Sequence, residues 1–185
     1  MSVTFSWNRL QVSFRTDIGL KRKINQDAVL VQPDLGLFAV ADGMGGHNAG
    51  EVASQIAVNT LREFIKSSAG LETKTADLLN QTFLEAHNAI LEASRQNSAW
   101  DEMGTTLVVA LNEGGSSFVI GHVGDSRAYS ICPNGIELLT EDHTFLTEWI
   151  KHGLISAEEA RNHPARHGLY MALGINDEFE PRIAR

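Results

Sequence analysis

Hydrophobic residues recur with two different periods along the chain, and the two periods predict both helices and strands. Over residues 50–68 and 75–96 they return every three or four positions, which predicts two long helices that each bury one side. Over 27–42 and 104–140, β-branched residues gather in short runs between turn sequences, which predicts strands. Residues 5–14 alternate loosely between apolar and polar and predict one opening strand.

The last third of the chain predicts shorter elements. Residues 144–153 have a helical pattern that stops at a glycine, and Ser156 stands three positions before Glu159, as in a capping box that starts a second short helix. The tail over 169–185 leaves both helix and strand open. Strands cluster before and after the two long helices, and this order favours an α+β domain of packed antiparallel sheets over a doubly wound parallel sheet.

Length and charge narrow the class of protein. A chain of 185 residues with 43% hydrophobic residues suits a single domain with its own core. A formal charge of −8 argues against a general nucleic-acid binder. No apolar run approaches the ~20 residues that span a bilayer, and Cys132 is the only cysteine, so we expect a cytoplasmic protein without membrane contact.

The candidate chemistry lies in the stretch VADGMGGH, residues 40–47. Asp42 follows an apolar run, so we expect its carboxylate at the end of a buried strand, where a cation or hydrogen bonds have to compensate the charge. The glycines that follow leave the backbone accessible, and the helix predicted near Gly50 directs its N-terminus to the same place. All-oxygen ligands suit Mg²⁺ or Mn²⁺. The alternatives are an ordinary Asp-Gly turn and a nucleotide-phosphate loop, although the P-loop ending is missing.

Five stretches, in this order, resemble the metal-dependent serine/threonine protein phosphatases of type 2C, the PPM family, in its bacterial branch. They are RTDIGLKRKINQDA, VADGMGGHNAGEVAS, MGTTLVVAL, GHVGDSRAYSI and LTEDHTFL, and the resemblance extends from about Arg15 to Arg185. It implies a four-layer α-β-β-α sandwich, in which two antiparallel sheets are flanked by helices and metals lie at one end. It also implies a signalling hydrolase that acts on phosphoserine and phosphothreonine.

The same resemblance implies metal roles for four residues. Asp42 matches the carboxylate that bridges two Mn²⁺ or Mg²⁺ ions, and Gly43 supplies its backbone carbonyl. Asp27 belongs to the acidic cluster and acts through metal-bound waters, while Asp125 matches a ligand of a third, more weakly held ion. Simple turn roles for Asp27 and Asp125 are the alternatives.

Two further residues are matched to the substrate by the resemblance. Arg22 matches the arginine that holds the substrate phosphate, for which a guanidinium fork is suited, and His47 is the proposed proton donor to the leaving alcohol. The alternatives are a solvated surface charge for Arg22 and an ordinary hydrogen-bonding imidazole for His47. Residues 143–164 resemble a mobile flap beside the site that selects substrates. Three other histidines show no metal-site spacing and are expected to be structural: His87, His122 and His143.

The sequence departs from the family pattern at two places. Gln26 stands where many members carry Glu. Members also continue to a strand ending in Ser-Asp-Gly and to a later Asp-Asn pair that bind metal, whereas Asp177 is the only aspartate after Asp142 here. We therefore expect a C-terminally short phosphatase domain, with weakened metal binding and exposed sheet edges that favour oligomerisation.

Three functions stand as hypotheses at this point. The first is a phosphoprotein phosphatase that uses a metal-activated water on substrates of a serine/threonine kinase. The second is a catalytically impaired module that binds phosphoproteins or regulates partners. The third, a nucleotide-binding protein, has the least support.

Overall fold

The computed structural model describes residues 2–7, 10–45, 49–70, 72–175 and 179–184. Its central feature is an antiparallel sheet with the strand order β10-β7-β6-β4-β3, to which β5 is added beside β4. The strands of this main sheet are β3 (Asp27–Gln32), β4 (Leu37–Met44), β5 (Gly104–Thr105), β6 (Leu107–Gly114), β7 (Ser117–Val123) and β10 (Arg182–Ala184). The predicted hairpin over 27–42 is confirmed as β3 and β4, joined through the short 3₁₀ helix η1 (Pro33–Leu35).

Two hairpins form separate two-stranded sheets. The first pairs β1 (Ser2–Trp7) with β2 (Leu10–Arg15), and the second pairs β8 (Tyr129–Cys132) with β9 (Gly135–Leu138). The prediction of one strand over 5–14 was wrong, because the chain reverses between Trp7 and Leu10 and the two halves pair with each other. Alternation alone could not show this reversal.

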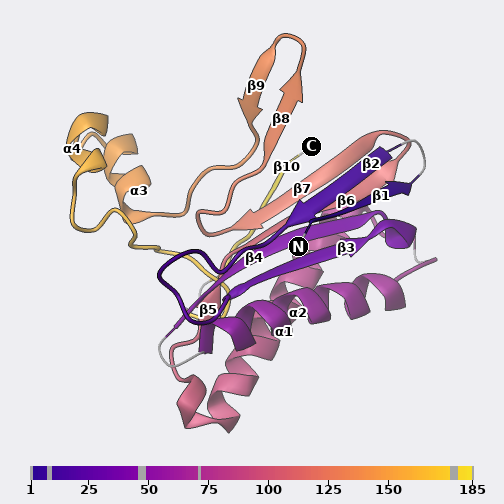
Figure 1. Ribbon diagram of the computed structural model, residues 1–185, viewed down its shortest axis with the longest axis horizontal. Coiled ribbons are helices and arrows are strands. Elements are labelled where there is room, and N and C mark those ends of the chain that lie inside the picture. The colour runs from indigo at the N-terminus through magenta and orange to yellow at the C-terminus, as the bar shows by residue number, and fades with distance from the viewer. Residues whose placement is uncertain (1, 8–9, 46–48, 71, 176–178, 185) are drawn as a thin grey trace.

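Two long helices cover one face of the main sheet (Figure 1). They are α1 (Ala49–Ser67) and α2 (Thr75–Gln96), so both predicted helices are confirmed. The side of α2 that faces the core is the predicted stripe of Leu79, Phe83, Ala86 and Ile90, each fully buried. Alternate strand residues face these helices, and they are Leu30, Leu37, Ala39, Leu107 and Val109.

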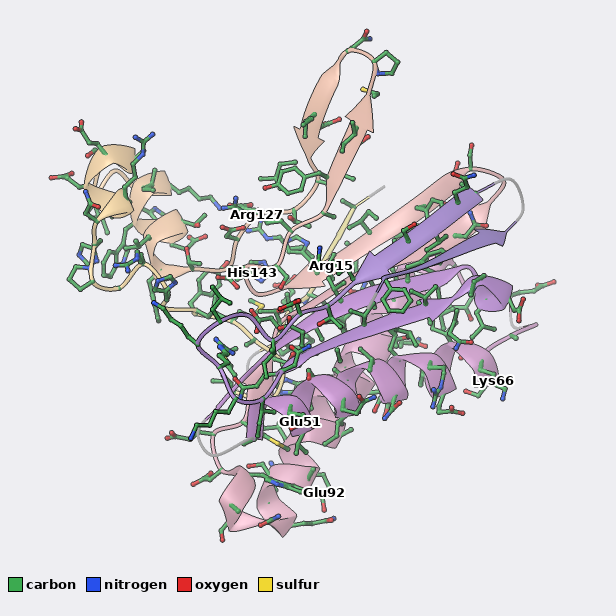
Figure 2. The ribbon with its side chains drawn as sticks, in the orientation of Figure 1. Arg15, Glu51, Lys66, Glu92, Arg127 and His143 are labelled. Carbon is green, nitrogen blue, oxygen red and sulfur yellow. The ribbon has the colours of Figure 1, made fainter. Side chains whose placement is uncertain are left out.

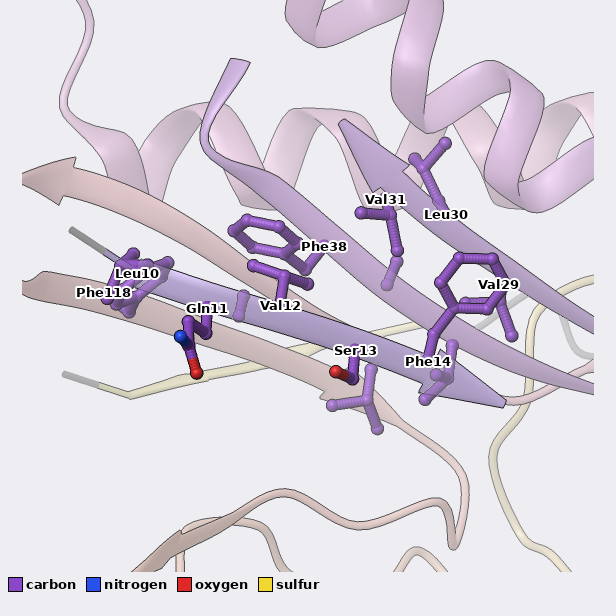
Figure 3. A pocket seen from close by; sticks show the side chains of 14 residues that line it. Leu10, Gln11, Val12, Ser13, Phe14, Val29, Leu30, Val31, Phe38 and Phe118 are labelled. Carbon is purple, nitrogen blue, oxygen red and sulfur yellow. The ribbon is translucent and has the colours of Figure 1, made fainter. Parts of the chain in front are cut away.

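The opposite face of the main sheet is apolar as well. Its side chains, among them Val31 and Phe38, line a groove whose other wall is β2, including Val12 and Phe14 (Figure 3). A sheet that is apolar on both faces is typical of strands covered on both sides. The described residues thus form a helix layer, the main sheet and the β1–β2 sheet over its second face.

Two short helices follow the strands and project away from the main sheet (Figure 1). They are α3 (Phe145–Lys151) and α4 (Ala157–Arg161), both predicted, and Ser156 with Glu159 forms the expected capping box. The bridge between Thr144 and Leu169 closes the base of this segment. In the part of the chain that the structure describes, no helix has the length and apolar character to cross a membrane.

Candidate metal centre

Asp27 and Asp42 meet at one end of the main sheet. Asp27 is the first residue of β3, and Asp42 lies close to the end of β4. The β3–β4 ladder places them directly opposite each other. Like charges in such a pair are destabilising, since paired side chains on one face lie only about 4.5–5.5 Å apart. Asn25 steadies the start of β3, because its Oδ1 accepts the backbone N–H of Asp27 at 3.1 Å.

Gly43 lies where β4 runs against the first turn of α1. A Cβ atom on Gly43 would stand 1.9 Å from the carbonyl oxygen of Gly50, so only glycine permits this approach. The Gly43 N–H donates to the backbone oxygen of Gln26 at 3.0 Å, and the Ser54 hydroxyl donates to the same oxygen at 2.7 Å. Asp42 and Gly43 thus belong to strand β4 and not to a turn, but Gly43 does lie against the start of α1, and the Gln26 backbone oxygen bonds both Gly43 and Ser54.

Arg22 reaches the same place from the loop before β3. Its Nη1 donates to Gln26 Oε1 at 2.8 Å, which leaves its other N–H donors for an anion. Arg22, Gln26, Asp42, Gly43 and Asp125 all line one cleft of ≈ 510 Å³. Residues far apart in the sequence thus gather around one space, as the resemblance implies.

The sequence predicted a buried carboxylate at Asp42, and the structure differs from this prediction. Asp42 is exposed, because its side chain looks into the open cleft and not into the core. Its surroundings still act on its charge: partial desolvation, and then the neighbouring carboxylate of Asp27, raise the pKa of the Asp42 carboxyl, with a further contribution from Asp125. The Arg22 guanidinium opposes this effect.

The donor atoms of the cleft fit a hard divalent cation. Carboxylates and a backbone carbonyl are the ligands that Mg²⁺ and Mn²⁺ prefer, and a cation would offset the repulsion between Asp27, Asp42 and Asp125. Among the described residues, no group of three or more His, Cys, Asp or Glu side chains is close enough to hold an ion by itself. An ion held here would therefore need ligands besides these side chains, such as the Gly43 carbonyl and water.

His47 lies outside the described residues, so its predicted role as proton donor is not addressed by the structure. A different imidazole, His167, lines the same cleft as Arg22 and Asp125. Sequence reasoning missed His167, because no local motif marks it and it follows the expected flap by three positions. The three histidines that were expected to be structural are buried outside the lining of this cleft: His87, His122 and His143.

The apolar groove between β2 and the main sheet is a second cavity (Figure 3). It is lined by side chains such as Val29, Val40 and Phe118, and none of the described residues that line it is titratable. Its lining is mostly apolar, in contrast to the cleft that contains Arg22, Asp42 and Asp125.

Comparison with known proteins shows the family of the chain. The sequence matches the family model for "Protein phosphatase 2C" over residues 21–148. The serine/threonine phosphatase stp of Listeria monocytogenes is 39% identical over 176 residues, which are 92% of this chain and 69% of that protein. Protein phosphatase PhpP of Streptococcus pneumoniae is 34% identical over 182 residues, or 93% of this chain and 71% of that protein.

Solved structures confirm the α+β fold. The serine/threonine phosphatase PstP/Ppp of Mycobacterium tuberculosis has a TM-score of 0.79 at 35% identity, covering 92% of this chain and 70% of that one. Stp1 from Staphylococcus aureus has a TM-score of 0.82 at 31% identity, covering 100% and 69%. The catalytic domain of PstP in complex with 2 manganese ions has a TM-score of 0.76 at 34% identity, covering 92% and 69%. The acidic cleft, the matching sequence and the shared fold together show that the chain belongs to the protein phosphatase 2C family of serine/threonine protein phosphatases.

Proposed function

We propose that the chain hydrolyses phosphoserine and phosphothreonine in proteins, at the cleft lined by Arg22, Asp42, Gly43 and Asp125, with Asp27 opposite Asp42. The observation that carries the proposal is the Arg22 guanidinium, held by Gln26 at Nη1, in one open cleft with the carboxylates of Asp42 and Asp125. A phosphoryl group brings negative charge, which Arg22 and bound cations can receive. The net charge of −8 makes such a local positive group necessary.

Each residue has a defined part in the proposed reaction. The fork of Arg22 binds two phosphoryl oxygens and orients the phosphorus, while Gln26 fixes the guanidinium. Asp42 and the Gly43 carbonyl would hold the divalent ions, and Asp27 would act through water bound to them. When bound, Mn²⁺ or Mg²⁺ supplies water of lowered pKa and stabilises the charge of the transition state.

The leaving alcohol needs a proton, and two imidazoles are candidates. His47 is proposed from the sequence, and His167 lines the cleft within the described residues. Substrate choice is proposed for the segment 143–164, because a bridge joins Thr144 at its base to Leu169, which lines the cleft. We further propose that the substrates are products of a serine/threonine kinase.

A second candidate function is phosphoprotein binding without turnover. One observation favours it, namely that the described residues lack a group of three or more metal-holding side chains. Weak metal binding with retained Arg22 would leave recognition of phosphate while hydrolysis is slow.

Hydrolysis of phenyl phosphate and of a phosphothreonine peptide, titrated with Mn²⁺ and separately with Mg²⁺, tests the proposal. We expect turnover that requires the metal and that Asp42→Ala removes. Folded protein that binds the phosphopeptide through Arg22 but releases no phosphate at any metal concentration would favour the binding module instead.

A further inference from the structure

We propose that Thr106 is a positioning residue that fixes Asp42 relative to Asp125, through a chain of hydroxyl hydrogen bonds. The inference rests on the proposed function, since it concerns how the two carboxylates of that site are held at a set separation. Thr106 lies between β5 and β6 and is 3% exposed, so its hydroxyl is shielded from water.

The first contact of Thr106 is with the backbone of Asp42. The pairing of β4 with β5 and β6 keeps one register on both sides of this point, with Gly43 opposite Thr105 and Val40 opposite Val108. Thr106 is therefore the residue opposite Asp42, and its N–H donates to the Asp42 carbonyl at 3.0 Å. The Asp42 N–H donates to Thr106 Oγ1 at 3.0 Å, so a side chain takes the place of a ladder carbonyl.

The second contact of the same hydroxyl is with Ser126, the residue after Asp125. The two hydroxyl oxygens are 2.7 Å apart, and either can donate. The methyl group of Thr106 packs on Gly124, where an added Cβ would stand 2.6 Å from Thr106 Cγ2. Thr106 thus contacts the residues on both sides of Asp125, while it also binds Asp42.

The loop that carries Asp125 is held from the other side as well. The Gly124 carbonyl accepts the N–H of His143 at 3.0 Å, and the Gly124 N–H donates to His143 Nδ1 at 3.2 Å. With both neighbours of Asp125 fixed, its position relative to Asp42 depends on the hydroxyl link. Partners of metal ligands typically change metal affinity about 10- to 100-fold when they are removed.

The test compares Thr106→Val and Thr106→Ser with a matched control, Thr105→Val. Thr105 is fully buried next to Thr106, and its hydroxyl donates to the backbone oxygen of Thr106 at 2.9 Å and not to Asp42 or Ser126. The measurements are the Mn²⁺ dissociation constant, from the electron paramagnetic resonance of free Mn²⁺ without substrate, and the hydrogen exchange of the Asp42 amide.

We expect Thr106→Val to weaken Mn²⁺ binding about tenfold and to speed exchange of the Asp42 amide. Thr106→Ser keeps the hydroxyl and should restore both quantities, and Thr105→Val should leave both near the wild-type values. If Thr106→Val and Thr105→Val bind Mn²⁺ with equal affinity, this inference is wrong, while the proposed function is not affected. A wild-type chain that binds no Mn²⁺ would overturn the proposed function together with it.

A double-mutant cycle decides the matter even if Thr106→Val does not fold. It uses Ser126→Ala, Asp125→Ala and the double variant, because Ser126 is less buried than Thr106. Ser126→Ala should weaken Mn²⁺ binding in the wild-type background and have no further effect when Asp125 is absent. The same loss in both backgrounds would show that Ser126 acts without Asp125 and would contradict the positioning role.

Discussion

Asp27 and Asp42 stand directly opposite each other at the end of the β3–β4 ladder. Their repulsion lowers the stability of the metal-free sheet at the place where the proposed function needs both carboxylates. Opposed carboxylates repel each other, and desolvation together with this repulsion raises the pKa of Asp42. The rest of the ladder pairs apolar residues, such as Val29 with Val40, which hold the strands together regardless. A strained charge pair at the edge of a stable sheet is expected of a functional site.

Replacing Asp42 with Asn should raise the stability of the metal-free protein and remove its response to Mn²⁺. A carboxyl whose pKa is raised is harder to ionise in the folded state than in the unfolded state, so its charge disfavours folding at pH 7. Thermal unfolding with and without Mn²⁺ measures both effects. For the wild type, Mn²⁺ at 100 times its dissociation constant should add about 2.7 kcal/mol.

The matched control for that variant is Asp34→Asn, which removes an exposed carboxylate from η1. It should leave both the metal-free unfolding temperature and the Mn²⁺ response unchanged. If Asp42→Asn still gains stability from Mn²⁺ as the wild type does, Asp42 is not a ligand.

Replacing Arg22 with Ala should lower kcat/KM for phosphorylated substrates, because its guanidinium is free to bind the phosphoryl oxygens. Hydrogen bonds to charged groups contribute about 1.5–3 kcal/mol, which corresponds to roughly a ten- to hundredfold loss. Arg22→Lys should not restore the activity, since Lys lacks the planar fork. Lys21→Ala and Lys23→Ala are matched controls, and a loss of equal size in them would mean that only general positive charge matters.

Replacing Arg127 should loosen the junction between the Asp125 loop and the segment that begins at His143 (Figure 2). Its Nε and Nη2 donate to the two carboxylate oxygens of Asp142 at 2.7 and 2.6 Å. Because Arg127 is exposed, we expect Arg127→Ala to lower the free energy of unfolding by only about 1 kcal/mol. Chemical denaturation measures this loss.

Arg127→Lys should behave like Arg127→Ala, because only a guanidinium can bind both oxygens at once. Asp17→Asn is the control, since Asp17 pairs with Arg15 at 3.7 Å and both side chains are exposed. Full stability of Arg127→Lys would show that charge alone, without bidentate geometry, holds the junction.

His143 should make the protein less stable in mild acid. The side chain is fully buried, and desolvation, followed by the nearby charges of His122 and Arg182, lowers the pKa of His143 to about 4. The unfolded chain takes up this proton near the ordinary value of 6.5, whereas the folded chain does so only near 4. The free energy of unfolding should therefore fall as the pH is lowered across that interval.

Urea denaturation between pH 7 and pH 4 checks this slope, with His143→Gln compared to His152→Gln. His143→Gln should flatten the pH dependence, although burial also lowers the pKa of His122 and leaves part of the slope. His152 is exposed beside Glu148 and should change little. A slope in His143→Gln equal to that of the wild type would assign the acid sensitivity to other groups.

Local sequence patterns predicted most helices and strands, because helix periodicity and capping depend on residues that are close together in the chain. The stripe of Leu79, Phe83 and Ile90 predicted α2, and Ser156 with Glu159 predicted the start of α4. The resemblance nominated Arg22, Asp27, Asp42, Gly43 and Asp125, and the structure brings these five to one end of the sheet, with Asp27 opposite Asp42 and the others around one cleft. Their roles stay predictions until metal and substrate binding are measured.

The sequence by itself determined the helices α1 to α4, most of the strands and the carboxylate at the end of an apolar run. It did not determine the reversal between β1 and β2, the exposure of Asp42, or the presence of His167 in the cleft. Those features depend on which strands pair and on how loops pack against the sheet. An example is the hydrogen bond between Asp42 and Thr106, which are 64 positions apart in the sequence. Only the folded sheet decides such contacts, because strand register and close packing are set between distant segments.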